Sequence, residues 1–80
     1  MPRLSKRAQQ DLDSLPPALR PKADAILAKI DAEPGIGHKL LGKLEGLRSA
    51  RVGRSHRLIY EVVEGEVRVL SIPNRRDAYR

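Results

Sequence analysis

Two segments of the sequence concentrate side chains that can bind phosphate. In residues 48–57, arginines recur at every third position with no acidic residue between them: Arg48, Arg51, Arg54 and Arg57. The last six residues hold a single acid, Asp77, among basic residues and a tyrosine: Arg75, Arg76, Tyr79 and Arg80. A guanidinium stays charged and binds phosphate bidentately. The two segments therefore indicate a polyanionic ligand, with nucleic acid the first candidate, unless the charge serves only to keep a small protein soluble.

Composition limits the chemistry open to this chain. Eighty residues with a net charge of +6 predict one domain, residues 1–80, with no separate cofactor domain. The absence of cysteine excludes disulfides, thiolate nucleophiles and zinc–thiolate sites, and two histidines argue against a zinc cage. We expect neither metal nor cofactor. Tyr60 and Tyr79 are the two aromatic residues, which excludes a multi-aromatic platform for stacking bases.

The first 34 residues have the period of helices. Ser5 can cap a helix whose apolar face is Ala8, Leu12 and Leu15, and Pro16-Pro17 should end it. A second helix is predicted from Pro17 through the stripe that ends at Ile30, and the Pro34–Gly37 segment stops it. The sequence therefore predicts a helical hairpin, preceded by a short strand at residues 2–4.

The second half has the period of strands. Residues 57–63 alternate and are rich in β-branched side chains, residues 67–72 form a second strand, and Glu64-Gly65 turns between them. Residues 47–52 predict a third strand, whereas residues 38–44 fit either a strand or an extended loop. The predicted fold is α+β, with the helices on one face of a small antiparallel sheet. Short apolar runs and an N-terminal MPRLSKRAQQ without an apolar core predict a cytoplasmic protein with no membrane contact.

The order of these elements carries a resemblance. Two helices, then LRSARVGRSHRLIYEV and finally VRVLSIPNRRDAYR, resemble the RelE/ParE superfamily of toxins from type II toxin–antitoxin systems. The most similar motifs are the H-R-L-I-Y strand and the C-terminal I-x-x-R-R-D-x-Y, and the similarity covers essentially the whole chain.

The resemblance implies a toxin whose active surface is covered by a cognate antitoxin, through an acidic or amphipathic segment. Two activities remain open. RelE-like members cut mRNA, usually on the ribosome and without a metal, and so inhibit translation. ParE-like members share the fold, lack the cutting residues and inhibit DNA gyrase. We favour the hypothesis that the protein is a RelE-like endoribonuclease, an mRNA interferase. The alternative hypothesis is a gyrase inhibitor.

The resemblance also suggests catalytic residues. Metal-free RNA cleavage needs a base for the 2′-hydroxyl, cations for the phosphate oxygens and an acid for the leaving oxygen. Arg57 matches the strand arginine that stabilises the phosphate, and Arg75 is preferred to Arg76 as the tail cation. Tyr79 matches a tyrosine that stacks on a base or assists proton transfer, although a free tyrosine, with a pKa of about 10, needs cationic neighbours to act as a base. His38 falls where one subgroup places a catalytic carboxylate.

The remaining basic residues are predicted to bind RNA: Arg48, Arg51, Arg54, Arg76 and Arg80. Strand alternation allows only one of Arg48 and Arg51 to face the RNA, and we favour Arg51 because Val52 belongs in the core. Surface roles stay open for Arg54, Arg57 and His38, as does simple packing for Tyr79. His56 is more often structural in this position.

The sequence departs from the nuclease pattern in two places. Ser49 and Ala50 stand near the positions where some members carry a lysine pair, and Asn74 replaces a histidine common near the tail motif. An asparagine cannot take up a proton. The general base is therefore the catalytic role for which the sequence offers the weakest candidate. The alternative function, inhibition of DNA gyrase, stays open.

Overall fold

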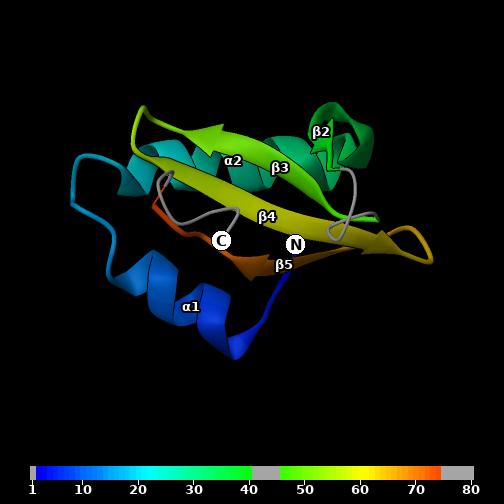
Figure 1. Cartoon of the computed structure of the whole chain (residues 1–80), viewed down its shortest axis with the longest axis horizontal. Coiled ribbons are helices and arrows are strands. Elements are labelled where there is room, and N and C mark those ends of the chain that lie inside the picture. Colours follow the sequence, from blue (N-terminus) through cyan, green and yellow to red (C-terminus); the bar gives the residue numbers. More distant parts are fainter. Residues whose placement is uncertain (1, 41–45, 75–80) are drawn as a thin grey trace.

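The computed structural model describes residues 2–40 and 46–74. Within them, two helices cover one face of a five-stranded sheet with the strand order β1-β5-β4-β3-β2 (Figure 1). The elements follow in chain order as β1 Arg3–Leu4, α1 Lys6–Asp13, α2 Arg20–Ala32, the 3-10 turn η1 Pro34–Ile36, β2 His38–Lys39, β3 Arg48–Val52, β4 His56–Val63 and β5 Glu66–Ser71. Neighbouring strands from β2 to β5 are antiparallel, while β1 pairs with β5 in parallel. The predicted α+β fold is confirmed.

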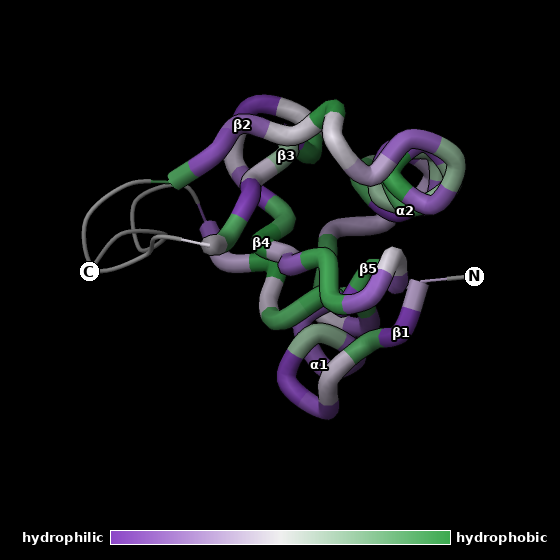
Figure 2. The backbone as a smooth tube through the Cα atoms, turned by 90° about the vertical axis from the view of Figure 1, so that its right-hand side faces the viewer, coloured by the Kyte–Doolittle hydropathy of each residue, from purple (hydrophilic) through white to green (hydrophobic). Residues whose placement is uncertain are grey.

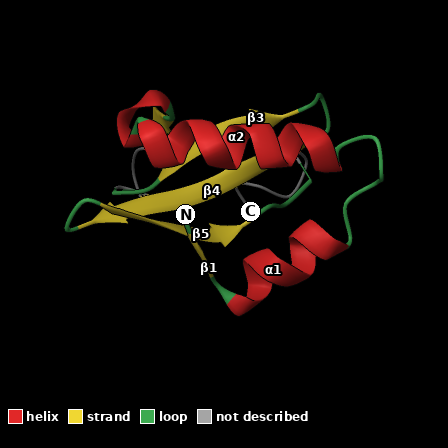
Figure 3. Ribbon diagram, turned by 180° about the vertical axis from the view of Figure 1, so that it is seen from behind, coloured by secondary structure: helices red, strands yellow, loops and turns green. Residues whose placement is uncertain are grey.

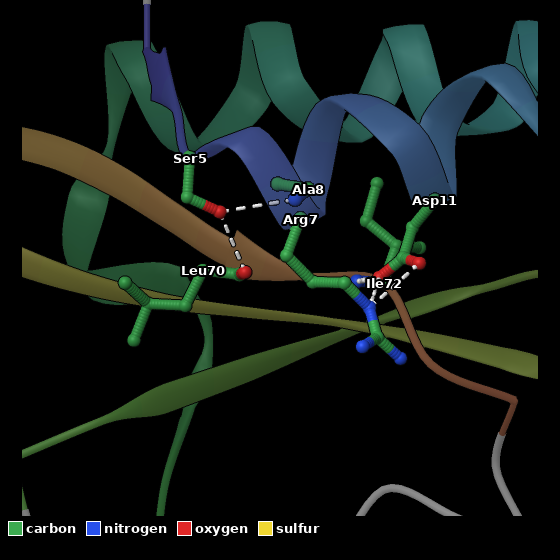
Figure 4. A network of polar contacts seen from close by, with 6 residues as sticks. All are labelled: Ser5, Arg7, Ala8, Asp11, Leu70 and Ile72. Carbon is green, nitrogen blue, oxygen red and sulfur yellow. Dashed lines mark hydrogen bonds and ion pairs between the residues drawn. The ribbon is translucent and has the colours of Figure 1, made fainter.

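Helix α1 begins where the sequence predicts. The Ser5 side chain accepts a 3.0 Å hydrogen bond from the backbone N–H of Ala8 and donates a 2.7 Å bond to the carbonyl of Leu70 in β5 (Figure 4). One hydroxyl thus caps the helix and ties it to the sheet. Ala8 and Leu12 are buried, and the helix ends at Asp13, ahead of Pro16-Pro17.

Helix α2 starts at Arg20, later than the sequence predicts. The backbone N–H of Leu19 donates a 2.8 Å bond to the carbonyl of Pro16, so a separate turn precedes the helix, and Pro21 supplies the proline of its first turn. Ala23 and Ile30 are fully buried. In Figure 3, α2 crosses in front of β3 and β4, and α1 lies beside β5. Neither described helix is long and apolar enough to cross a membrane.

The core lies between the helices and the sheet. Figure 2 shows hydrophobic stretches of β4 and β5 in the middle of the molecule. Cross-strand partners share a face of a sheet, so the buried strand residues on the helix side can be named: Val52, Leu58, Tyr60, Val67 and Val69. The β4–β5 turn has positive φ at Glu64 (53°) and Gly65 (79°), as the tight hairpin connection predicted from the sequence requires.

Candidate nucleic-acid interface

Two arginines stand side by side on the sheet face that the helices leave open. Arg51 of β3 is the direct cross-strand partner of Arg57 of β4. Directly opposite residues of an antiparallel pair have Cβ atoms about 4.5–5.5 Å apart and point to the same face. Ala50 and Val52, which alternate with Arg51, pack into the core beneath the helices. The predicted alternation of this strand is therefore confirmed, and it turns Arg51 away from the core.

His38 lies on the same open face as the arginine pair. It is the cross-strand partner of Ser49, which in turn pairs with Ile59 of β4. Arg51 is two residues along β3 from Ser49, so His38 and Arg51 are diagonal neighbours, about 7–8 Å apart in a regular sheet. His38 is exposed at the edge strand β2. In the described part of the segment that the sequence left ambiguous, a short strand therefore places this histidine diagonal to Arg51. Residues 41–44 of that segment lie outside the described residues.

A small cationic pocket adjoins the arginine pair at the β3–β4 turn. Its volume is about 150 Å³, and it is lined by Arg51, Gly53, Arg54, His56 and Arg57. None of the described residues that line it carries a carboxylate. The His56 imidazole is oriented by a 2.7 Å hydrogen bond between its Nδ1 and the Ser55 hydroxyl. Three guanidinium groups and an imidazole around one small space favour an anion there.

The turn that carries Arg54 is held by helix α2. Gly53 has a φ of +64°, which side-chain-bearing residues rarely adopt. A Cβ atom at this position would also lie 2.6 Å from Leu19 Cδ2, just ahead of α2. The backbone angle therefore favours glycine in this turn, and a side chain there would also have to displace the end of the Leu19 side chain.

The segment after β5 docks against the start of β4. The backbone N–H of Arg57 donates a 3.0 Å bond to the carbonyl of Pro73, and Asn74 forms an isolated bridge with His56. Helix α1 reinforces this docking, because the Asp11 carboxylate accepts a 2.9 Å bond from the backbone N–H of Ile72 and a 3.1 Å bond from Arg7 Nε (Figure 4). The chain therefore continues toward its tail from a point beside Arg57.

The tail residues of the predicted site lie outside the described residues. They are Arg75, Arg76, Tyr79 and Arg80. Their assigned roles stay predictions.

Arg48 has a structural contact that the sequence did not indicate. Its guanidinium donates to the carbonyls of Gly35 and Gly37, at 3.2 Å and 3.0 Å. It alternates with Arg51 and so belongs to the helix side of β3, as the sequence predicts for one of the two. Here it fastens the loop after α2 to the sheet, and its RNA-binding role stays a prediction.

Tyr60 is the second residue whose part the sequence missed. It is fully buried, its hydroxyl donates a 2.8 Å bond to the carbonyl of Pro34, and it accepts a 3.0 Å bond from the backbone N–H of Gly37. Gly37 leaves no room for a side chain, since a Cβ atom there would lie 2.8 Å from Tyr60 Cε1. A lone tyrosine in an apolar strand, together with a Pro-Gly-rich loop, is the available sequence signal for such an anchor.

Metal ligands do not gather in the part of the chain that the structure describes. No three His, Asp or Glu side chains come together there in a way that could hold an ion. The described part of the candidate site therefore consists of basic side chains and the strands and turn that hold them.

Comparison with known proteins gives the family of this chain. The model of the ParE toxin of the type II toxin–antitoxin system parDE matches residues 3–79. The chain therefore belongs to this toxin family, within the RelE/ParE superfamily. No curated protein sequence matches it.

Solved structures agree with this assignment. The RelBE2 toxin–antitoxin complex of Mycobacterium tuberculosis contains a chain that is 30% identical, with a TM-score of 0.77, over 91% of this chain and 94% of the other. The YoeB–YefM complex of Staphylococcus aureus gives 28% identity, a TM-score of 0.75 and coverage of 90% and 92%. YafQ of Escherichia coli shares the fold alone, with 15% identity, a TM-score of 0.81 and coverage of 100% and 98%.

Proposed function

We propose that this toxin is an mRNA endonuclease that acts on ribosome-bound message without a metal ion and so inhibits translation in the cytoplasm. The cross-strand pair Arg51–Arg57 carries the proposal, because it places two arginines opposite each other on the face of the sheet that the helices do not cover. In this proposal residues 1–80 act as a single toxin domain. The similarity to RelBE2 and YoeB chains supports it through the resemblance described above.

The reaction needs no group beyond the side chains of this chain. The 2′-hydroxyl of the substrate loses its proton and attacks the adjacent phosphorus, the P–O5′ bond breaks, and the leaving oxygen takes up a proton. The products are a 2′,3′-cyclic phosphate and a 5′-hydroxyl. Arg57 and Arg51 neutralise the charge that builds on the phosphate oxygens. His38 or Tyr79 exchanges the protons, and Arg75 adds a third cation.

The proposal is tested by mapping RNA ends after the toxin is induced in cells. We expect new 5′-hydroxyl ends within translated messages, and a loss of cleavage of about 10²–10³-fold for Arg57→Ala, the range found when one charge-stabilising donor is removed from a transition state. Arg3→Ala is the matched control, because Arg3 lies in β1 at the far edge of the sheet and is exposed. Intact messages, or unchanged cleavage by both Arg57→Ala and Arg75→Ala, would contradict the proposal.

A second function is favoured by a different observation. The matching family model is that of ParE toxins, and the chain has Ser49, Ala50 and Asn74 where nucleases of this type carry proton-transferring or basic residues. In that reading the basic face binds DNA gyrase and performs no chemistry. Translation and DNA synthesis measured separately after induction distinguish the two. An early fall in translation with replication intact supports the nuclease, and the opposite order supports the gyrase inhibitor.

We further propose that an antitoxin covers the arginine face. The RelBE2 and YoeB–YefM relatives were crystallised as toxin–antitoxin complexes. A basic surface on a small domain favours an acidic, amphipathic segment as its partner. Carboxylates of that segment would then occupy the space that phosphates take in the RNA complex. Co-expression with the neighbouring reading frame, followed by co-purification, tests this pairing. Arg51→Glu should weaken it, and unaltered co-purification of that variant would place the antitoxin elsewhere.

A further inference from the structure

The pocket at the β3–β4 turn extends beyond the open face that the proposed reaction uses. Arg51 and Arg57 lie on the open face, but the pocket also includes Arg54 from the turn and His56. His56 pairs with the core residue Val52, so its side chain belongs to the opposite side of the strand. The pocket therefore lies at the end of the hairpin, shares Arg51 and Arg57 with the site where a scissile phosphate would bind, and adds Arg54 and His56 to it.

We propose that this pocket binds a backbone phosphate of the RNA that flanks the scissile phosphate. The inference rests on the proposed function, because it assumes that RNA crosses the Arg51–Arg57 face. Arg51 and Arg57 belong both to the face and to the pocket, so an RNA chain bound on the face also passes Arg54 at the pocket. The proposed reaction does not use Arg54, so its positive charge is available to the flanking phosphate.

The size and chemistry of the pocket select a phosphate. A volume of about 150 Å³ accommodates a phosphate group with its hydrogen-bonding shell, and the described lining residues include three arginines and no acidic residue. His56 is the only ring in the lining, so no platform for stacking a base is present among these residues. A contact to phosphate alone carries no base information. Arg54 should therefore affect binding strength equally for all sequences and leave the choice of cleavage position unchanged.

The pocket is also held in place before RNA arrives. Gly53 is packed against Leu19, and the Ser55 hydroxyl holds the His56 ring. On the other side, the Pro73 carbonyl accepts the backbone N–H of Arg57. A preformed site loses less conformational entropy on binding than a flexible one.

The test compares Arg54→Gln with the matched control Arg3→Gln, which removes the same charge from the far edge of the sheet. Binding of a 2′-O-methyl oligoribonucleotide, which cannot be cut, is measured by fluorescence anisotropy over a salt series. For Arg54→Gln we expect an affinity loss of about tenfold at low salt. The slope of log K against log salt should fall by about 0.7, the value for one single-strand phosphate contact. Cleavage should show a raised KM, an unchanged kcat and the same cut sites. Arg54→Lys keeps the charge but lacks the planar guanidinium, so its RNA affinity should fall between those of wild type and Arg54→Gln.

Equal affinity and salt slope for Arg54→Gln and wild type would overturn the proposal. So would a changed cut-site pattern, since that would mean base readout. A second measurement separates this outcome from a failure of the proposed function. Inorganic phosphate should shift the amide signals of Gly53, Arg54 and Ser55 in NMR spectra of the wild-type toxin and not of Arg54→Gln. Phosphate binding with no effect of Arg54→Gln on RNA affinity would show an anion site without a part in RNA binding, which also overturns the proposal. If the toxin binds RNA through Arg54 but does not cut it, the result supports the phosphate-binding pocket and contradicts the proposed endonuclease activity.

Discussion

The Tyr60 hydroxyl donates a 2.8 Å hydrogen bond to the carbonyl of Pro34, and this one contact joins the middle of β4 to the 3-10 turn η1 that follows α2. The same oxygen accepts from Gly37, and Arg48 donates to the carbonyls on either side of Ile36. Two strand residues thus hold the loop that leads into β2, the strand that carries His38. Contacts on the helix side of the sheet therefore hold the strand that carries His38 of the candidate site.

Replacing Tyr60 with phenylalanine should destabilise the protein without disturbing its core. The ring remains, but the Pro34 carbonyl and the Gly37 N–H lose their partner. We expect the free energy of unfolding to fall by about 1–3 kcal/mol, the cost of leaving such groups unpaired. Urea denaturation measures this change, and hydrogen exchange at Gly37 should speed up. An unchanged stability would mean that water replaces the hydroxyl at no cost.

Arg51→Gln should make the protein more stable and less toxic. Two like charges directly opposite on neighbouring strands destabilise a sheet, so removing the charge of Arg51 should stabilise the fold by about 0.2–1 kcal/mol. Thermal unfolding checks the gain, and growth after induction checks the loss of toxicity. A loss of stability on this substitution would argue that an anionic group already neutralises the pair.

Asp11 should matter through its bond to Ile72 and not through its ion pair with Arg7. Asp11→Ala leaves the Ile72 N–H without its acceptor, and we expect a loss of about 1–3 kcal/mol in urea denaturation. Asp11→Asn keeps an acceptor oxygen and should recover most of that loss. Arg7→Gln removes only an exposed ion pair and should cost less than about 1 kcal/mol. Equal losses for Arg7→Gln and Asp11→Ala would assign the effect to the ion pair instead.

Gly53→Ala should be costly because it adds a clash to an unfavourable backbone angle. We expect a loss of about 1–3 kcal/mol. In the background of Leu19→Ala, which removes the clashing methyl group, the same substitution should cost less by about 1 kcal/mol. A double-mutant cycle by denaturation measures this coupling. Strict additivity would show that the backbone angle alone sets the cost.

Local patterns predicted most of the fold, and tertiary contacts account for what they missed. Ser5 as a cap, the Glu64-Gly65 turn and the alternation around Arg51 depend on neighbours in sequence, and all three are confirmed. The sequence left the pairing of the short first strand open, and only the distant β5 decides that it is parallel. The late start of α2 follows from a turn over Pro16–Leu19 that no hydrophobic period reveals.

The site was predictable as a set of residue types but not as an arrangement. Spacing identified Arg51 and Arg57, and their direct pairing follows from the register of the β3–β4 hairpin. That Arg48 would bind backbone carbonyls was not predictable, because a guanidinium can donate to a carbonyl as well as to a phosphate. Nor did the sequence show that Asp11 would reach Ile72, a contact across 61 positions of chain.

The parallel pairing of β1 with β5 has a consequence for the order in which the chain can fold during its synthesis. Ser5 reaches Leu70 across 65 positions of chain, so the first strand finds its place only after nearly all of the protein has been synthesised. Contacts of such long sequence separation form late in folding. A nascent chain therefore completes most of its translation before β1 can pair with β5 at the edge of the sheet.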